Sequence, residues 1–162
     1  MAEKFLTELN RRNVHYGEEV RKVRDLFSRK QESLAKEDDK FFSKYWQVYA
    51  WAAIIGFING KRIIGADLVH QNSFQYQMIT NGSENISNGL LLMAIGKIVA
   101  KDHEDVLDIR RIMTIISEYA EGGASHVLEL RQTPAYESKF NYADDYFFEI
   151  LGRTEKEPIP QL

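Results

Sequence analysis

One stretch of this chain constrains its fold more than any other, because residues 41–58 place apolar side chains around almost the whole circumference of a helix. The main stripe runs from Phe42 through Trp46 and Tyr49 to Ala53, and more aromatic residues point in other directions. A helix of this kind must be surrounded by other elements, so we expect it to be the central helix of a helical domain.

The same stretch is too short to cross a membrane. Its most apolar part, residues 45–58, has about 14 residues, whereas a membrane-spanning helix needs roughly 20. Lysines and an arginine flank it, and residues 1–13 lack the apolar core of a signal peptide. We therefore expect a cytoplasmic protein without a membrane contact.

The ends of the central helix can be predicted from its flanking residues. Asp38 or Asp39 is expected to cap its start, because a carboxylate there accepts from free amides at the positive end of the helix dipole. Asn59-Gly60 is expected to end it, since both residues tolerate a left-handed conformation. A hairpin turn at Asn59-Gly60 is the alternative, but no two-residue alternation flanks it. The small residues Ala52, Ala53 and Gly56 would let another helix approach closely.

The remaining pattern is helical almost throughout. We predict an amphipathic helix with a basic outer face over 17–34, an ambiguous short helix within 66–80, a helix capped by Ser83 or Ser87 that runs to residue 99, and a helix that starts near Asp102. We expect Gly122-Gly123 to stop that helix before a segment over 124–131, and Asn141 to cap a last helix. The expected architecture is an all-α, single-domain bundle of about five or six helices over residues 1–154, followed by a disordered or strapped tail over 155–162.

Composition excludes several classes of function. The chain has no Cys, so it holds no disulfide, thiolate zinc site or cysteine nucleophile. Its net charge of −3 is unlike that of a strongly basic nucleic-acid binder. The charge is nevertheless uneven, because residues 1–62 are net positive and residues 63–162 are net negative. Such asymmetry can mark a surface that meets an acidic partner, and the alternative is two ordinary solvated faces.

Two stretches of the sequence together resemble those of a known group of proteins. Residues 52–62 read Ala-Ala-Ile-Ile-Gly-Phe-Ile-Asn-Gly-Lys-Arg, and residues 116–123 read Ile-Ser-Glu-Tyr-Ala-Glu-Gly-Gly. This order resembles small accessory proteins found beside Dnd DNA-phosphorothioation systems and in related bacterial defence islands. The resemblance covers about residues 41–131, although Ile63-Ile64 stands where a Pro-containing continuation would be expected. It implies a DNA-modification or antiphage setting, and it carries over no catalytic residue.

Five residues are candidates for binding. Lys61 and Arg62 follow a helix end, where cations offset the dipole, and they could also contact a phosphate or an acidic partner. Arg21 and Arg24 would extend a basic patch if the fold brings them near. Trp51 lies off the main apolar stripe and could be partly exposed at a partner surface.

No catalytic or metal-binding motif is visible. Glu118, Glu121, His126 and Glu129 have the spacing of metal ligands, but a second such motif is missing, and we expect an ordinary polar helix end there. Gly56, Gly60, Gly122 and Gly123 are interpreted as structural residues at helix ends. We expect no cofactor, no metal and no enzymatic activity.

The sequence therefore favours a non-enzymatic accessory or scaffold protein that binds another protein through an apolar patch rimmed with basic residues. Nucleic-acid binding by the basic N-terminal helix is the alternative, and a small hydrolase or metal enzyme ranks third. Self-association remains open.

Overall fold

The computed structural model describes residues 2–28, 42–98 and 108–132, and in these residues the chain forms six helices and one two-stranded sheet. In chain order the elements are α1 (Ala2–Arg11), β1 (Asn13–Tyr16), α2 (Glu18–Phe27), α3 (Tyr45–Ile58), β2 (Val69–Gln75), α4 (Gln77–Gly82), α5 (Glu84–Gly96) and α6 (Ile109–Gln132). The protein is mostly helical, as predicted, but the prediction of an all-α fold is wrong because of the sheet. No described helix is long and apolar enough to span a membrane.

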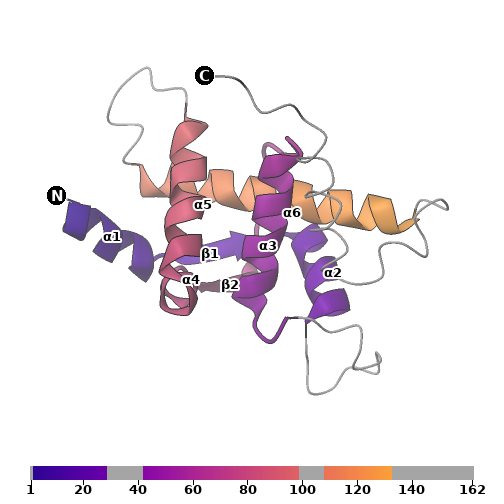
Figure 1. Cartoon of the computed structure of the whole chain (residues 1–162), viewed down its shortest axis with the longest axis horizontal. Coiled ribbons are helices and arrows are strands. Elements are labelled where there is room, and N and C mark those ends of the chain that lie inside the picture. The colour runs from indigo at the N-terminus through magenta and orange to yellow at the C-terminus, as the bar shows by residue number, and fades with distance from the viewer. Residues whose placement is uncertain (1, 29–41, 99–107, 133–162) are drawn as a thin grey trace, which may run out of the picture.

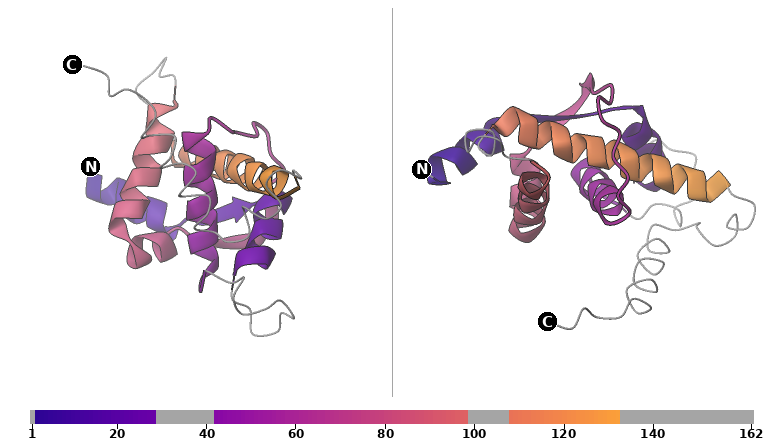
Figure 2. Two further views of the ribbon diagram at one scale, coloured as in Figure 1. Left: turned by 45° about the vertical axis from the view of Figure 1, so that its right-hand side comes forward. Right: turned by 90° about the horizontal axis from the view of Figure 1, so that it is seen from above.

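The 24-residue helix α6 runs through the middle of the molecule (Figure 1). α3 and α5 pack on one side of it, whereas α2 and the sheet lie on the other side (right view of Figure 2). α1 sits at one end, near α4. The contacts of α6 with both layers make it the shared core of the fold.

The burial predicted for the apolar helix is confirmed, since most side chains of α3 are buried, but the helix in the middle is α6, and α3 packs beside it. The helix begins at Tyr45, later than predicted, and Asp38 and Asp39 lie outside the described residues. Its first turn is closed by Gln47, whose side-chain oxygen accepts from the amide of Lys44 at 3.1 Å. It ends at Ile58, where the sequence predicts, and the chain continues as a connector instead of a hairpin.

The sheet was not predicted because β1 is very short and β2 is mostly polar. β1 has only four residues, of which Val14 and Tyr16 are buried. It pairs antiparallel with β2, and the register shifts so that His15 lies opposite Ser73 but Tyr16 lies opposite Val69. This irregularity and the polar composition of β2 hide the two-residue period. A strand therefore occupies much of the region where we expected one short helix.

Other helix boundaries differ by a few residues. Ser83 caps α5 as predicted, since its hydroxyl accepts from the amide of Ile86 at 3.3 Å. α5 ends at Gly96 instead of residue 99. Asp108 caps α6 by accepting from the amide of Arg110 at 3.0 Å. The predicted cap at Asp102, the helix from Asn141 and the tail over 155–162 lie outside the described residues.

Candidate functional site

The crossing of α3 and α6 brings two backbones into direct contact. The prediction that Gly122 and Gly123 stop a helix is wrong, because α6 continues through both. A Cβ at Gly123 would lie 2.6 Å from the amide nitrogen of Gly56 and closer still to the carbonyl oxygen of Ala52. Real Cβ atoms do not approach other heavy atoms so closely, so this crossing requires glycine.

The four glycines that we interpreted as helix ends therefore have two roles. Gly60 follows the end of α3 with a positive φ of 62° and is a helix-end residue. Gly56, Gly122 and Gly123 instead lie inside helices and allow close approach, which corrects the prediction for these three. The close approach expected from the small residues of α3 is confirmed.

Glu118 of α6 holds the connector that follows α3. Its carboxylate accepts from the Arg62 Nε at 2.7 Å and from the amide of Gly65 at 2.9 Å. Its backbone carbonyl accepts from the amide of Ile63 at 3.1 Å. Glu118 is only 4% exposed, so these bonds act in a partly dry environment where they are stronger than in water. We call residues 61–66 the anchored loop.

The base of the anchored loop rests directly on the helix crossing. The amide of Lys61 donates to the carbonyl of Gly56 at 2.7 Å, and a Cβ at Gly122 would lie 2.6 Å from the carbonyl carbon of Lys61. The ring of Tyr119 lies beneath the Arg62 guanidinium, 5.6 Å from it, and meets the ring of Phe57 edge-on at 5.7 Å. The stretches 52–62 and 116–123, which carry the resemblance, thus form one packed unit.

The apex of the anchored loop is a tight turn that exposes an isoleucine. The amide of Ala66 donates to the carbonyl of Ile63 at 3.3 Å, and Gly65 has a φ of 73°, which a type II turn requires at its third position. Ile64 occupies the second position and is 78% exposed. The loop is therefore fixed at its base and apolar at its tip.

Exposed hydrophobic residues are concentrated at this place. Of the eight large hydrophobic side chains that are exposed in the described part of the chain, four fall between residues 57 and 64. We call these four the apical patch: Phe57, Ile58, Ile63 and Ile64. The patch lies at the end of α3 from which the connector crosses over α6 (right view of Figure 2).

A second buried carboxylate joins α6 to α2. Glu121 accepts from the amides of Gly17 at 2.7 Å, Glu19 at 3.0 Å and Val20 at 3.3 Å. These amides belong to the start of α2, so Glu121 caps that helix from another element. Burial raises the pKa of Glu121, and the three amide bonds oppose the shift.

The predicted basic patch on α2 is not available as a set of free charges. Arg21 pairs with Glu18, which lies one turn earlier on the exposed surface. Arg24 contacts the Tyr16 hydroxyl at 2.8 Å and the Asp25 carboxylate at 3.0 Å, and its side chain is only 12% exposed. Within the described residues, neither arginine forms an ion pair or a side-chain hydrogen bond with the anchored loop, where Lys61 and Arg62 lie.

Trp51 was predicted to be partly exposed, and this prediction is wrong. It is 3% exposed and packs edge-on against Phe27 at 5.6 Å and against Phe42 at 5.5 Å. It also lines an apolar groove of about 300 Å³ between α3 and α5 together with Trp46 and Ile86. Trp51 therefore joins α3 to α2 and to Phe42, which lies three residues before α3 begins.

The cluster with metal-like spacing does not assemble. Across residues 2–28, 42–98 and 108–132, no group of three or more His, Cys, Asp or Glu side chains is placed to hold a metal ion. Glu118 and Glu121 turn instead toward the connector and toward α2.

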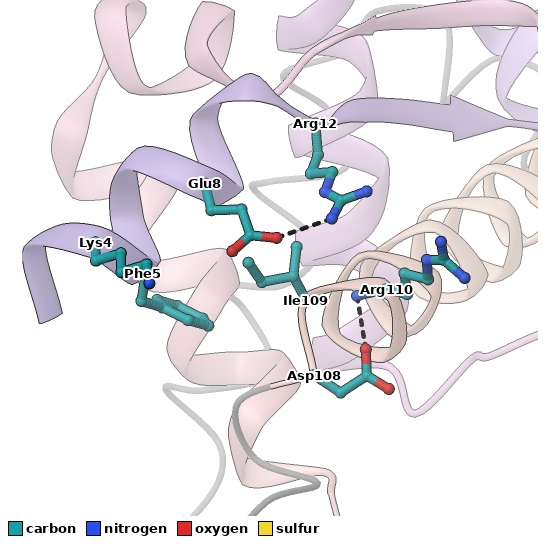
Figure 3. Close-up of a pocket in the computed structure, with 7 residues that line it drawn as sticks. All are labelled: Lys4, Phe5, Glu8, Arg12, Asp108, Ile109 and Arg110. Atoms are coloured by element: carbon teal, nitrogen blue, oxygen red, sulfur yellow. Dashed lines mark hydrogen bonds and ion pairs between the residues drawn. The ribbon is translucent and has the colours of Figure 1, made fainter. Parts of the chain in front are cut away.

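A cavity of about 480 Å³ opens where α1 meets the start of α6 (Figure 3). Its wall is charged, but Glu8 binds Arg12 at 2.8 Å and Asp108 caps α6. Both carboxylates are thus engaged within the wall (Figure 3), and the described residues that line the cavity do not form a converging set of groups that would define a reaction.

Sequence reasoning missed the roles of Glu118 and Glu121. The available signal was that two carboxylates interrupt an otherwise apolar helix, flanked by Ile116, Tyr119 and Ala120. A charged side chain on a buried face must be paired, so each of these carboxylates predicts a partner elsewhere in the chain, although the sequence does not show which residue that partner is. Comparison with protein-family models, curated proteins and solved structures finds no match for this chain.

Proposed function

We propose that this protein is a non-enzymatic accessory or scaffold protein that binds another protein through the apical patch. The observation that carries the proposal is the clustering of half of the exposed large hydrophobic side chains of the described part within residues 57–64. Exposed large hydrophobic side chains that are concentrated at one place are a common mark of a protein-binding site.

The anchoring of the loop supports the same proposal. A loop that is ordered before binding loses little conformational entropy when a partner docks, so more of the contact energy appears as affinity. Here the bonds from Glu118 to Arg62, Ile63 and Gly65 supply that order. Rigid scaffolds that present a loop are a frequent arrangement for binding.

We further propose that the protein works in the cytoplasm, in a bacterial DNA-modification or antiphage defence setting. This part of the proposal rests on the resemblance of residues 52–62 and 116–123 to accessory proteins of Dnd systems. The alternative of nucleic-acid binding through α2 has less support, because Arg21 and Lys22 are paired with Glu18 and Glu19.

A pull-down from the source cell tests the proposal when the tip of the loop is changed. The bait is the full chain, with nuclease treatment and a high-salt wash, and the variant is Ile64→Asp. Leu92→Asp is the matched control, since Leu92 is 68% exposed but lies on α5. We expect a partner that Ile64→Asp loses and Leu92→Asp retains. A partner that both variants retain, or nucleic acid that salt removes, would contradict the proposal.

A further inference from the structure

Two lysines lie beside the apical patch and have no carboxylate partner among the described residues. Lys61 begins the anchored loop, and Lys97 follows the last residue of α5. Both are exposed, and neither forms an ion pair with a residue of the described part. Arg62 differs from them, because Glu118 already neutralises it.

The fold fixes the two lysines at one end of the molecule. The Lys97 ammonium lies 5.3 Å from the centre of the Phe57 ring, which places the end of α5 against the end of α3. The backbone amide of Lys61 is bound to the carbonyl of Gly56 at 2.7 Å. Phe57 is thus an exposed ring with Lys97 over it and Lys61 four residues further along the chain.

This juxtaposition restricts the chemistry of a partner. An apolar segment that covers Ile64 and Phe57 would also remove water from Lys61 and Lys97, and an ammonium that loses water without a counter-charge is costly. A partner that supplies carboxylates at those positions removes this cost and gains specificity. Two lysines are too few for strong nucleic-acid affinity, which grows with the number of phosphates neutralised.

We infer that the partner binds through a segment that combines apolar side chains with aspartate or glutamate, the apolar groups on the apical patch and the carboxylates at Lys61 and Lys97. This inference rests on the proposed function and specifies the chemistry of its partner. The positive excess of residues 1–62, which include Lys61, agrees with it. The net charge of −3 does not oppose it, because charges act mainly within about 8 Å at physiological salt.

The test uses a display library of random short peptides, selected against the full-length chain at physiological salt. We expect the enriched peptides to carry both apolar and acidic residues. The affinity of one enriched peptide, measured by fluorescence anisotropy, should fall about tenfold in the double variant Lys61→Glu, Lys97→Glu, and should weaken with added salt. The double variant Lys61→Gln, Lys97→Gln, which removes charge without reversing it, should give a smaller loss.

A matched control has the same change in net charge elsewhere. Lys4 and Lys44 are exposed on α1 and just before α3, so the double variant Lys4→Glu, Lys44→Glu should bind like the wild type. Enriched peptides without acidic residues, equal affinity for both charge-reversal variants, or no enriched peptide at all would overturn the inference.

Failure of the inference and failure of the proposed function can be told apart. If Ile64→Asp abolishes peptide binding while the Lys61 and Lys97 variants retain it, the apical patch is the binding site and the inference of an acidic partner is wrong. If the Ile64→Asp variant binds the peptide as well as the wild type, the proposal that the apical patch is the binding site is wrong.

Discussion

A single methyl group at Gly123 tests the helix crossing on which the anchored loop is built. A Cβ there would lie 2.6 Å from the Gly56 amide nitrogen, whereas ordinary contacts begin at 3.4 Å. Relieving this contact alone would separate the two helices by about 0.8 Å, and the still closer Ala52 carbonyl oxygen requires more, so at least a quarter to a half of the van der Waals attraction across the gap is lost. The crossing is lined by fully buried Ala52 and Ala120, so the loss extends over the centre of the core.

The expected magnitude follows from two opposing terms. Overpacking in a close-packed core costs about 1–3 kcal/mol, and we expect the top of that range because the obstacle is backbone. This loss is offset by about 1 kcal/mol, because alanine is a better helix former than glycine. Gly123→Ala should therefore lower the free energy of unfolding by about 2 kcal/mol.

The same substitution at Gly89 provides the control. Gly89 lies within α5, and a Cβ there would meet nothing within 4 Å. Gly89→Ala should raise the free energy of unfolding by about 0.5–1 kcal/mol. Urea unfolding followed by circular dichroism measures both variants. If Gly123→Ala is as stable as the wild type, the close helix contact does not exist as described.

Three further predictions concern polar groups of the core. Glu118→Gln removes the charge that holds the anchored loop, so the Gly65 amide should exchange its hydrogen at least tenfold faster by mass spectrometry, while an unchanged rate would show that the carboxylate does not order the loop. Burial raises the pKa of Glu121 above its ordinary value of 4.5, so the contribution of Glu121 to stability is largest below pH 4.5 and is lost as pH rises through the raised pKa. In urea unfolding, the difference in free energy of unfolding between the wild type and Glu121→Gln should therefore shrink from acidic to neutral pH. A difference that grows instead would refute the predicted direction of this pH dependence. The buried Tyr49 hydroxyl bonds the Ser117 hydroxyl at 2.8 Å, so Tyr49→Phe should cost about 1–2 kcal/mol, and a double-mutant cycle with Ser117→Ala should show less than additive loss.

The parts of the fold that were predictable depend on local patterns. The burial of α3 follows from apolar residues on every side, and its end follows from Asn59-Gly60, whose conformations are set by neighbouring atoms. Ser83 as the cap of α5 is also a local feature. Such features can be recognised without knowledge of the partner helix.

The parts that were missed depend on partners far along the chain. Gly122 and Gly123 look like a helix stop in isolation, but their contacts are with Lys61 and Ala52, and a continuous α6 becomes favourable only when α3 approaches it. Trp51 was predicted to be partly exposed because it lies off the main apolar stripe, and the sequence did not show that Phe27 of α2 packs against it. The candidate site shares this property: the sequence indicated Lys61 and Arg62, but not the Glu118 carboxylate from α6 that holds Arg62 in place.

In this chain, elements that are synthesised early depend on contacts with an element that is synthesised late. α6 is the last described element to leave the ribosome, yet the amide of Gly17 finds its acceptor, Glu121, 104 residues later. Until α6 emerges, the small-residue face of α3 has no helix to cover it, and the two outer layers have no middle layer between them. The nascent chain must therefore keep an apolar helix of 14 residues without its main partner while residues 59–132 are made, and its described part reaches the final arrangement only when α6 is inserted.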